Sequence, residues 1–96
     1  MAYMVHATDR PGALDVRKAN RDAHIEFLKA TGSQLLLAGP LLSNDGEMAG
    51  SLLIVDFETA DDVVHWLSGD PYSNAGLFDT VDITAFKPVI TNFGHK

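Results

Sequence analysis

Two apolar segments in the middle of the chain, joined by a short polar turn, restrict the possible folds more than any other feature. The segments are 34–40 and 50–57, and the sequence Ser-Asn-Asp-Gly at 43–46 is typical of a β-turn between two strands. Successive side chains of a strand point to opposite faces of a sheet, and here both faces are apolar. We therefore expect a β-hairpin that is covered on both sides. Its two faces are predicted to be Leu35, Leu37, Leu53 and Val55 against Leu36, Ala38, Leu52 and Ile54.

Four further segments complete the predicted order of elements. Residues 3–8 are rich in strand formers, 14–30 carry good helix formers without Pro or Gly, and 80–86 alternate as a last strand. Thr59 is a typical helix N-cap, so a second helix is expected to follow it and to run to about residue 68. The order strand, helix, strand, strand, helix, strand predicts an α+β fold of the ferredoxin-like βαββαβ type, an antiparallel sheet with two helices on one face.

The second face of this sheet predicts self-association. Two helices cover only one face, and an apolar sheet left open would expose a patch of roughly several hundred Å². A homodimer that packs sheet on sheet, as in a dimeric α/β barrel, is the simplest way to cover it. The alternative is a lid formed by the end of the chain. We expect one domain over residues 1–96, with a short strand extension at Val89 and Ile90 and a flexible tail at 91–96.

The charge balance and the absence of cysteine exclude several classes of function. Thirteen acidic residues against seven basic ones give a net charge of −6, which repels nucleic acid and anionic membrane surfaces. The chain offers no cysteine, no long apolar run and no glycine-rich phosphate loop, and its histidines lack metal-ligand spacing, so a metal site would arise only through folding. We expect a cytoplasmic protein without cofactor or metal, and without nucleic-acid or membrane partners.

The strongest candidate for chemistry is a carboxylate before a proline. Asp70 precedes Pro71 in a loop between the second helix and the last strand, and proline favours an extended backbone for the residue before it. Its candidate partner is His24 in the first helix, the natural proton carrier near neutral pH, because a carboxylate would fix the imidazole tautomer and stabilise the cation. A partly buried histidine with a local hydrogen bond and an ordinary Asp-Pro turn are the alternatives. His24 borders the predicted buried stripe of that helix, which consists of Val16, Ala19, Ala23, Phe27 and Ala30.

Two arginines on the same helix are candidates for substrate binding. Arg17 and Arg21 share a helical face with His24, at spacings near two turns and one turn. Their guanidinium groups would hold an anionic or phenolate ligand over the histidine. The alternative is ordinary surface ion pairing with the acidic residues at helical spacing, Asp15, Asp22 or Glu26.

Ser51 and Tyr72 are the remaining candidates for ligand binding. Ser51 opens a strand after a glycine, so its hydroxyl is available either to a ligand or to the backbone, whereas no Gly-x-Ser-x-Gly elbow supports a nucleophile. Tyr72 and Phe78 either form the wall of a pocket or anchor their loop.

Several separate motifs resemble the YciI-like (YCII-related) family. They are Arg17, Arg21, His24, Ala38-Gly39-Pro40, Gly46, Gly50-Ser51, Asp70-Pro71-Tyr72, Gly76 and Phe78. The resemblance runs from Tyr3 to about Val89. It implies a ferredoxin-like fold of the dimeric α/β-barrel superfamily and an active site with a histidine and an aspartate, here His24 and Asp70. Some relatives are linked to the removal of halide from aromatic catabolites.

The leading interpretation is a small cofactor-free enzyme. His24, oriented by Asp70, would serve as general acid and base on a small cyclic or aromatic substrate, in a lyase or isomerase type of reaction. The alternatives are a non-catalytic module of a homodimer that binds a small ligand or a partner, in which the His-Asp pair is structural, and a subunit of a larger catabolic complex.

Overall fold

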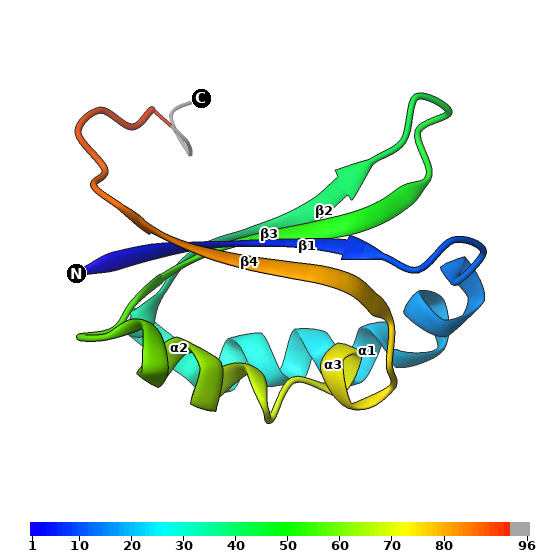
Figure 1. Ribbon diagram of the computed structural model, residues 1–96, viewed down its shortest axis with the longest axis horizontal. Coiled ribbons are helices and arrows are strands. Elements are labelled where there is room, and N and C mark those ends of the chain that lie inside the picture. Colours follow the sequence, from blue (N-terminus) through cyan, green and yellow to red (C-terminus); the bar gives the residue numbers. More distant parts are fainter. Residues whose placement is uncertain (93–96) are drawn as a thin grey trace.

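Two layers make up the computed structural model of the protein, which describes residues 1–92: an antiparallel sheet and a layer of helices on one of its faces (Figure 1). The predicted ferredoxin-like α+β fold is therefore confirmed. The strands are β1 (Ala2–Asp9), β2 (Leu35–Leu42), β3 (Met48–Asp56) and β4 (Phe78–Phe86). The helices are α1 (Leu14–Thr31), the 3-10 turn η1 (Gly32–Gln34), α2 (Ala60–Leu67) and α3 (Pro71–Asn74).

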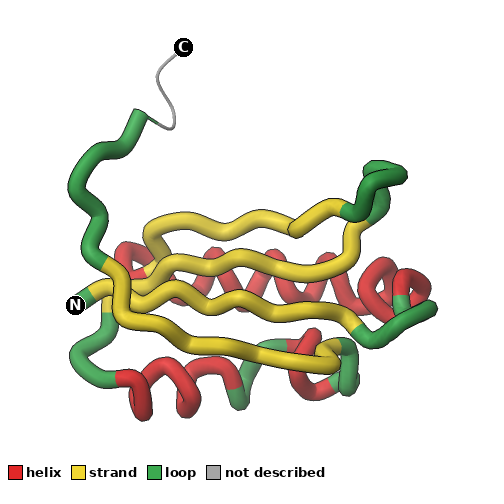
Figure 2. Tube along the Cα trace, turned by 45° about the horizontal axis from the view of Figure 1, so that its top comes forward, coloured by secondary structure: helices red, strands yellow, loops and turns green. Residues whose placement is uncertain are grey.

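The sheet has the strand order β2-β3-β1-β4, so the two outer strands are far apart in sequence (Figure 2). The predicted hairpin is present as the antiparallel pair of β2 and β3, closed by a turn in which Gly46 has φ +83°. A positive φ is strained for residues with a Cβ, which explains glycine at this position. Strand β1 lies between β3 and β4 and pairs antiparallel with both.

The apolar core lies between the sheet and the helices. Strands β1 and β3 contribute alternate side chains to it, as expected for a sheet with one face on the core. Helix α2 contributes Val63 and Leu67, and Thr59 caps it as predicted, accepting a hydrogen bond from the Asp62 amide. The buried members of the core are Tyr3, Val5, Leu53, Val55, Val63 and Leu67.

Helix α1 faces the sheet with a different side than the apolar periodicity predicts. Ala19, Ala23 and Ala30 are exposed, whereas Arg17 and His24 are its buried residues. The buried side lies one position further along the sequence, about 100° around the helix. Alanine tolerates water at little cost, so it indicates the inward side of a helix poorly. The predicted stripe was wrong in its alanines, whereas Val16 and Phe27 are partly buried and packed.

The face of the sheet away from the helices is not covered by them (Figure 1), and part of it is an apolar surface that includes Leu37 and Ile54. A β-bulge between Leu35 and Leu37 places Leu37 opposite Ile54 and Ala38 opposite Leu53, so the simple alternation predicted for β2 was wrong. A groove of about 390 Å³ runs along this face. It is lined by Leu36, Leu37, Ile54, Phe86, Pro88, Ile90 and Thr91.

The segment after β4 leaves the sheet (Figure 2). Val89 and Ile90 form no strand and are 79% and 85% exposed, so the predicted strand extension was wrong. Phe86 pairs with Ala2, the first residue of β1, so the partner strand ends there, and Pro88 has no N–H group to donate to a ladder beyond it. Most of the predicted tail, 93–96, lies outside the described residues. Across residues 1–92, no helix combines the length and the apolarity needed to cross a bilayer.

Candidate active site

A small pocket of about 150 Å³ lies between helix α1 and the hairpin β2-β3, with α3 at one side. Its volume fits a ligand of about one ring. It has polar and charged side chains from α1, α3 and β3 and apolar walls. The lining residues are Arg17, Arg21, His24, Ile25, Leu28, Ala38, Gly39, Pro40, Met48, Ser51 and Tyr72.

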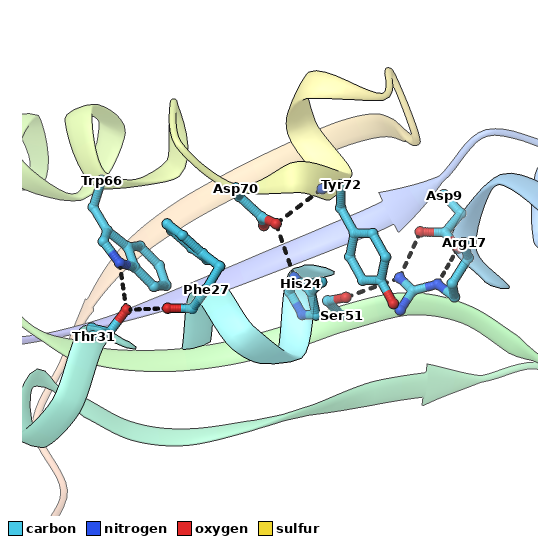
Figure 3. A network of polar contacts seen from close by, with 9 residues as sticks. All are labelled: Asp9, Arg17, His24, Phe27, Thr31, Ser51, Trp66, Asp70 and Tyr72. Carbon is cyan, nitrogen blue, oxygen red and sulfur yellow. Dashed lines mark hydrogen bonds and ion pairs between the residues drawn. The ribbon is translucent and has the colours of Figure 1, made fainter. Parts of the chain in front are cut away.

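His24 and Asp70 meet beside this pocket. Nδ1 of His24 lies 2.8 Å from Oδ1 of Asp70, and both side chains are buried (Figure 3). An ionised carboxylate can only accept a hydrogen bond, so the imidazole donates this bond through its Nδ1–H group. Nε2 has no hydrogen-bond partner among residues 1–92, and the ring lines the pocket. This tautomer leaves the basic nitrogen of the neutral imidazole free.

The Asp-Pro dipeptide determines the backbone conformation of Asp70. The residue has φ −72° and ψ 123°, the extended geometry predicted for a residue before proline. The segment after it was predicted as a loop, but it forms the short helix α3, with Pro71 at its first position and Asp70 as its N-cap. The Asp70 carboxylate accepts a 3.0 Å hydrogen bond from the Tyr72 amide. Its second oxygen, Oδ2, is buried without a hydrogen-bond partner among the described residues.

Tyr72 places an aromatic wall between the two polar parts of the site. Its ring stacks on His24 with centroids 3.9 Å apart and an interplanar angle of 15°. The Arg17 guanidinium carbon lies 4.7 Å from the same ring, and Figure 3 shows the phenol between the imidazole and the guanidinium. Burial raises the pKa of Tyr72, while the charges of Arg17 and Arg21 act in the opposite direction. Phe78 supports the ring edge-on.

Arg17 is a buried cation with a partner that helical spacing did not reveal. It forms a bidentate ion pair with Asp9, with Nε 2.7 Å from Oδ2 and Nη2 2.8 Å from Oδ1. Nη2 also donates to the Ser51 hydroxyl at 2.9 Å. Burial opposes the guanidinium charge, but the Asp9 carboxylate outweighs it, and the pKa of Arg17 is raised. The suggested surface pairing of Arg17 with acidic residues of its own helix was wrong.

The structure therefore brings five of the six predicted site residues to the lining of one pocket, and the sixth, Asp70, lies behind His24. Arg21 is exposed at the pocket and has no ion-pair partner within residues 1–92. Asp9 was missed, because it ends β1 eight positions before Arg17 and no sequence pattern links a strand end to a helix face. Only the fold brings these two residues together.

Comparisons with known proteins agree with the fold. The family described as YCII-related domain matches residues 1–87. The protein YciI of Escherichia coli O6:H1 (strain CFT073) is 35% identical over 97 residues, which cover 93% of this chain and 99% of that protein.

Two solved structures extend the comparison. The 5-chloro-2-hydroxyhydroquinone dehydrochlorinase of Burkholderia phenoliruptrix AC1100, solved with 2,5-dihydroxybenzoquinone, has a TM-score of 0.83 and 34% identity, covering 91% of this chain and 94% of that one. A NIPSNAP family protein of Agrobacterium tumefaciens has a TM-score of 0.56 and 15% identity, with coverage of 98% and 95%. The second likeness shows the fold alone.

Proposed function

Because this chain belongs to the YCII-related domain family, we propose that it is a small enzyme in which His24, oriented by Asp70, is the general acid and base. The observation that carries the proposal is the hydrogen bond from His24 Nδ1 to a fully buried carboxylate, beside a pocket of one-ring size. A buried carboxylate with one unpartnered oxygen is costly for stability. Such a cost is typical of residues kept for function.

The proposed chemistry is proton transfer with elimination or isomerisation. Nε2 removes a proton from a ring substrate, and the electron pair of that O–H or C–H bond forms a new double bond. In an elimination, the leaving group departs with the electrons of its own bond, so the substrate loses HX overall and no oxidant is consumed. Asp70 stabilises the imidazolium that forms. Proton transfer of this kind contributes about 10²- to 10⁴-fold to a rate.

The pocket favours a small cyclic or aromatic substrate with an oxygen substituent. Tyr72 forms an aromatic part of the pocket wall, and the exposed guanidinium of Arg21 lines the same pocket and attracts an anionic or phenolate group. The relative from Burkholderia phenoliruptrix acts, by its name, on a chlorinated hydroxyhydroquinone. Its 34% identity makes a related ring the first choice of substrate for this chain.

A second candidate function is a ligand-binding module in which the same pair is structural. The observation that favours it is the double role of Asp70, which caps α3 through the Tyr72 amide and fastens this helix to α1 through His24. Such a module would bind a ring compound without converting it.

We also propose that the protein is a homodimer joined through the open face of the sheet. This face carries an apolar groove of about 390 Å³, with Leu36 49% and Phe86 40% exposed. Exposed apolar faces of this kind are typical of interfaces between subunits.

Chloride release from 5-chloro-2-hydroxyhydroquinone tests the enzyme proposal. Wild type should release chloride, and His24→Gln and Asp70→Asn should each lose at least about 10²-fold of the rate, because both disturb the proton transfer. His65→Gln is the control, since His65 is an exposed histidine of α2 outside the pocket. Binding of the ring without turnover by wild type would favour the ligand-binding module.

A further inference from the structure

The Arg17 guanidinium is held in place by Asp9 and Ser51 without any ligand. The Asp9 carboxylate accepts hydrogen bonds from Nε and Nη2 of Arg17 in a bidentate pair. The Arg17 and Asp9 side chains are only 2% and 7% exposed. Two parallel hydrogen bonds define the plane of a guanidinium as well as its position. Asp9 thereby determines where Nη2 points, which is toward Ser51 (Figure 3).

The Ser51 hydroxyl is consequently a donor. A guanidinium has no acceptor, so the Ser51 oxygen must accept from Arg17 Nη2, and its own hydrogen is left for another partner. Ser51 is 2% exposed and lines the pocket, and among residues 1–92 its hydroxyl donates to no protein acceptor. A buried hydroxyl without an acceptor is costly, and an acceptor atom on a ligand would remove that cost.

We infer that Asp9 is a positioning residue of this site, which acts through Arg17 to make Ser51 the donor to an acceptor oxygen of a one-ring ligand. This inference rests on the proposed function. It adds a second polar group of the pocket, Ser51 with Arg17, to the first one, His24, and these two groups are called the poles of the pocket. His24 exchanges a proton at one end, and Ser51 with Arg17 receives a phenolate or carbonyl oxygen at the other. The substrate class is therefore a six-membered ring with oxygen functions at two separated positions.

The two poles lie close together, on either side of the Tyr72 ring (Figure 3). The centroid of this ring is 3.9 Å from that of the His24 imidazole and 4.7 Å from the guanidinium carbon of Arg17. His24 and Ser51 line the same pocket of about 150 Å³. A ligand of one ring in this pocket is therefore close to both residues.

Equilibrium binding of 4-nitrophenolate tests the second pole, because the probe is a ring with an acceptor oxygen and is followed by its visible absorbance. Ser51→Ala removes the donor, so it should weaken phenolate binding about tenfold, as expected for a hydrogen bond to a charged group. Asp9→Asn should weaken it in the same direction and add little in the Ser51→Ala background, because both act through one hydroxyl. Asp79→Asn, at an exposed position in β4, is the matched control.

The sign of the Asp9→Asn effect separates positioning from simple charge. Loss of the Asp9 carboxylate makes the net charge around Arg17 more positive, so charge alone predicts tighter phenolate binding. Tighter or unchanged binding would overturn the inference, and so would the absence of phenolate binding by wild type. Near-ultraviolet circular dichroism checks the fold of each variant.

Asp9→Glu covers the case in which Asp9→Asn does not fold. It keeps the charge but moves the carboxylate by one methylene, so positioning predicts weaker binding and charge alone predicts no change. The measurement involves no turnover, so its failure is distinguishable from a failure of the acid-base chemistry. That chemistry fails separately, if His24→Gln keeps full activity.

Discussion

Nδ1 of His24 lies 2.8 Å from Oδ1 of Asp70, although 46 positions of sequence separate the two residues. The contact joins the middle of α1 to the N-terminus of α3, and the Tyr72 ring covers it by stacking on the imidazole. The proposed proton chemistry and the structural support of α3 therefore depend on the same buried carboxylate. Different substitutions of Asp70 should therefore separate its effect on stability from its effect on activity.

Two substitutions of Asp70 should differ in stability. Asp70→Ala removes the partner of His24 and the cap of α3 together, so it should lower the free energy of unfolding by about 3–5 kcal/mol. Asp70→Asn keeps an oxygen that accepts from Nδ1 and from the Tyr72 amide, so the loss should be about 1–2 kcal/mol. Urea unfolding followed by Trp66 fluorescence measures both. Equal losses in the two variants would show that the carboxyl oxygen contributes nothing to the fold.

The ion pair between Asp9 and Arg17 should be coupled in a double-mutant cycle. Asp9→Asn or Arg17→Gln alone leaves one buried charge without a partner and should cost about 3–5 kcal/mol, while the double variant should lose clearly less than the sum. The pair between the N-terminal amine and Asp56 is the control, because its groups are 64% and 57% exposed. Asp56→Asn should change the stability by no more than about 1 kcal/mol. Additive losses in the cycle would contradict a direct pair.

Tyr72 should make the fold sensitive to alkali. Burial raises the pKa of its phenol in the folded state, so the folded protein holds this proton more tightly than the unfolded chain. The stabilising contribution is complete below the unfolded pKa of about 10 and is lost as the pH rises through the folded pKa. Thermal melts above about pH 10 should show a steeper loss of stability in wild type than in Tyr72→Phe. Parallel curves for the two proteins would argue against the raised pKa.

A charge on the open face should separate the proposed dimer. Ile54→Glu places a carboxylate beside the groove that Leu36 and Phe86 line, and burial of an unpaired charge between two sheets is strongly unfavourable. Light scattering should give twice the chain mass of 10.4 kDa for wild type and the mass of one chain for the variant. Val64→Glu is the control, because Val64 is 56% exposed on α2. A wild type with the mass of one chain would remove the proposed interface.

The sequence predicts the order of elements well because turns and periodicity are local signals. Gly46 in the hairpin turn, Thr59 at the start of α2 and Pro71 after Asp70 each act on neighbouring backbone, and each has the expected effect. The inward side of α1 was not predictable in the same way. Its alanines suggest an apolar stripe. Arg17 and His24 nevertheless face inward, because they form hydrogen bonds with the carboxylates at the end of β1 and at the N-cap of α3.

The candidate site was predictable in part. His24 and Asp70 stand out by residue type and by the proline that follows Asp70. The pairing of Arg17 with Asp9 depends on where β1 ends relative to α1, which is a property of the whole fold. The bulge at Leu36 is likewise a matter of register between β2 and β3, and alternation of apolar residues alone does not reveal it.

The tautomer of His24 tests the central claim most directly, and nitrogen-15 NMR of the imidazole measures it. In the neutral ring of wild type, Nδ1 should carry the proton and Nε2 should be unprotonated, because the Asp70 carboxylate accepts from Nδ1. Asp70→Ala removes this acceptor and should abolish the preference, while Asp56→Asn, far from the ring, should leave it unchanged. A wild-type spectrum with the proton on Nε2 would contradict the account, because that nitrogen then has no lone pair with which to accept a proton from a substrate.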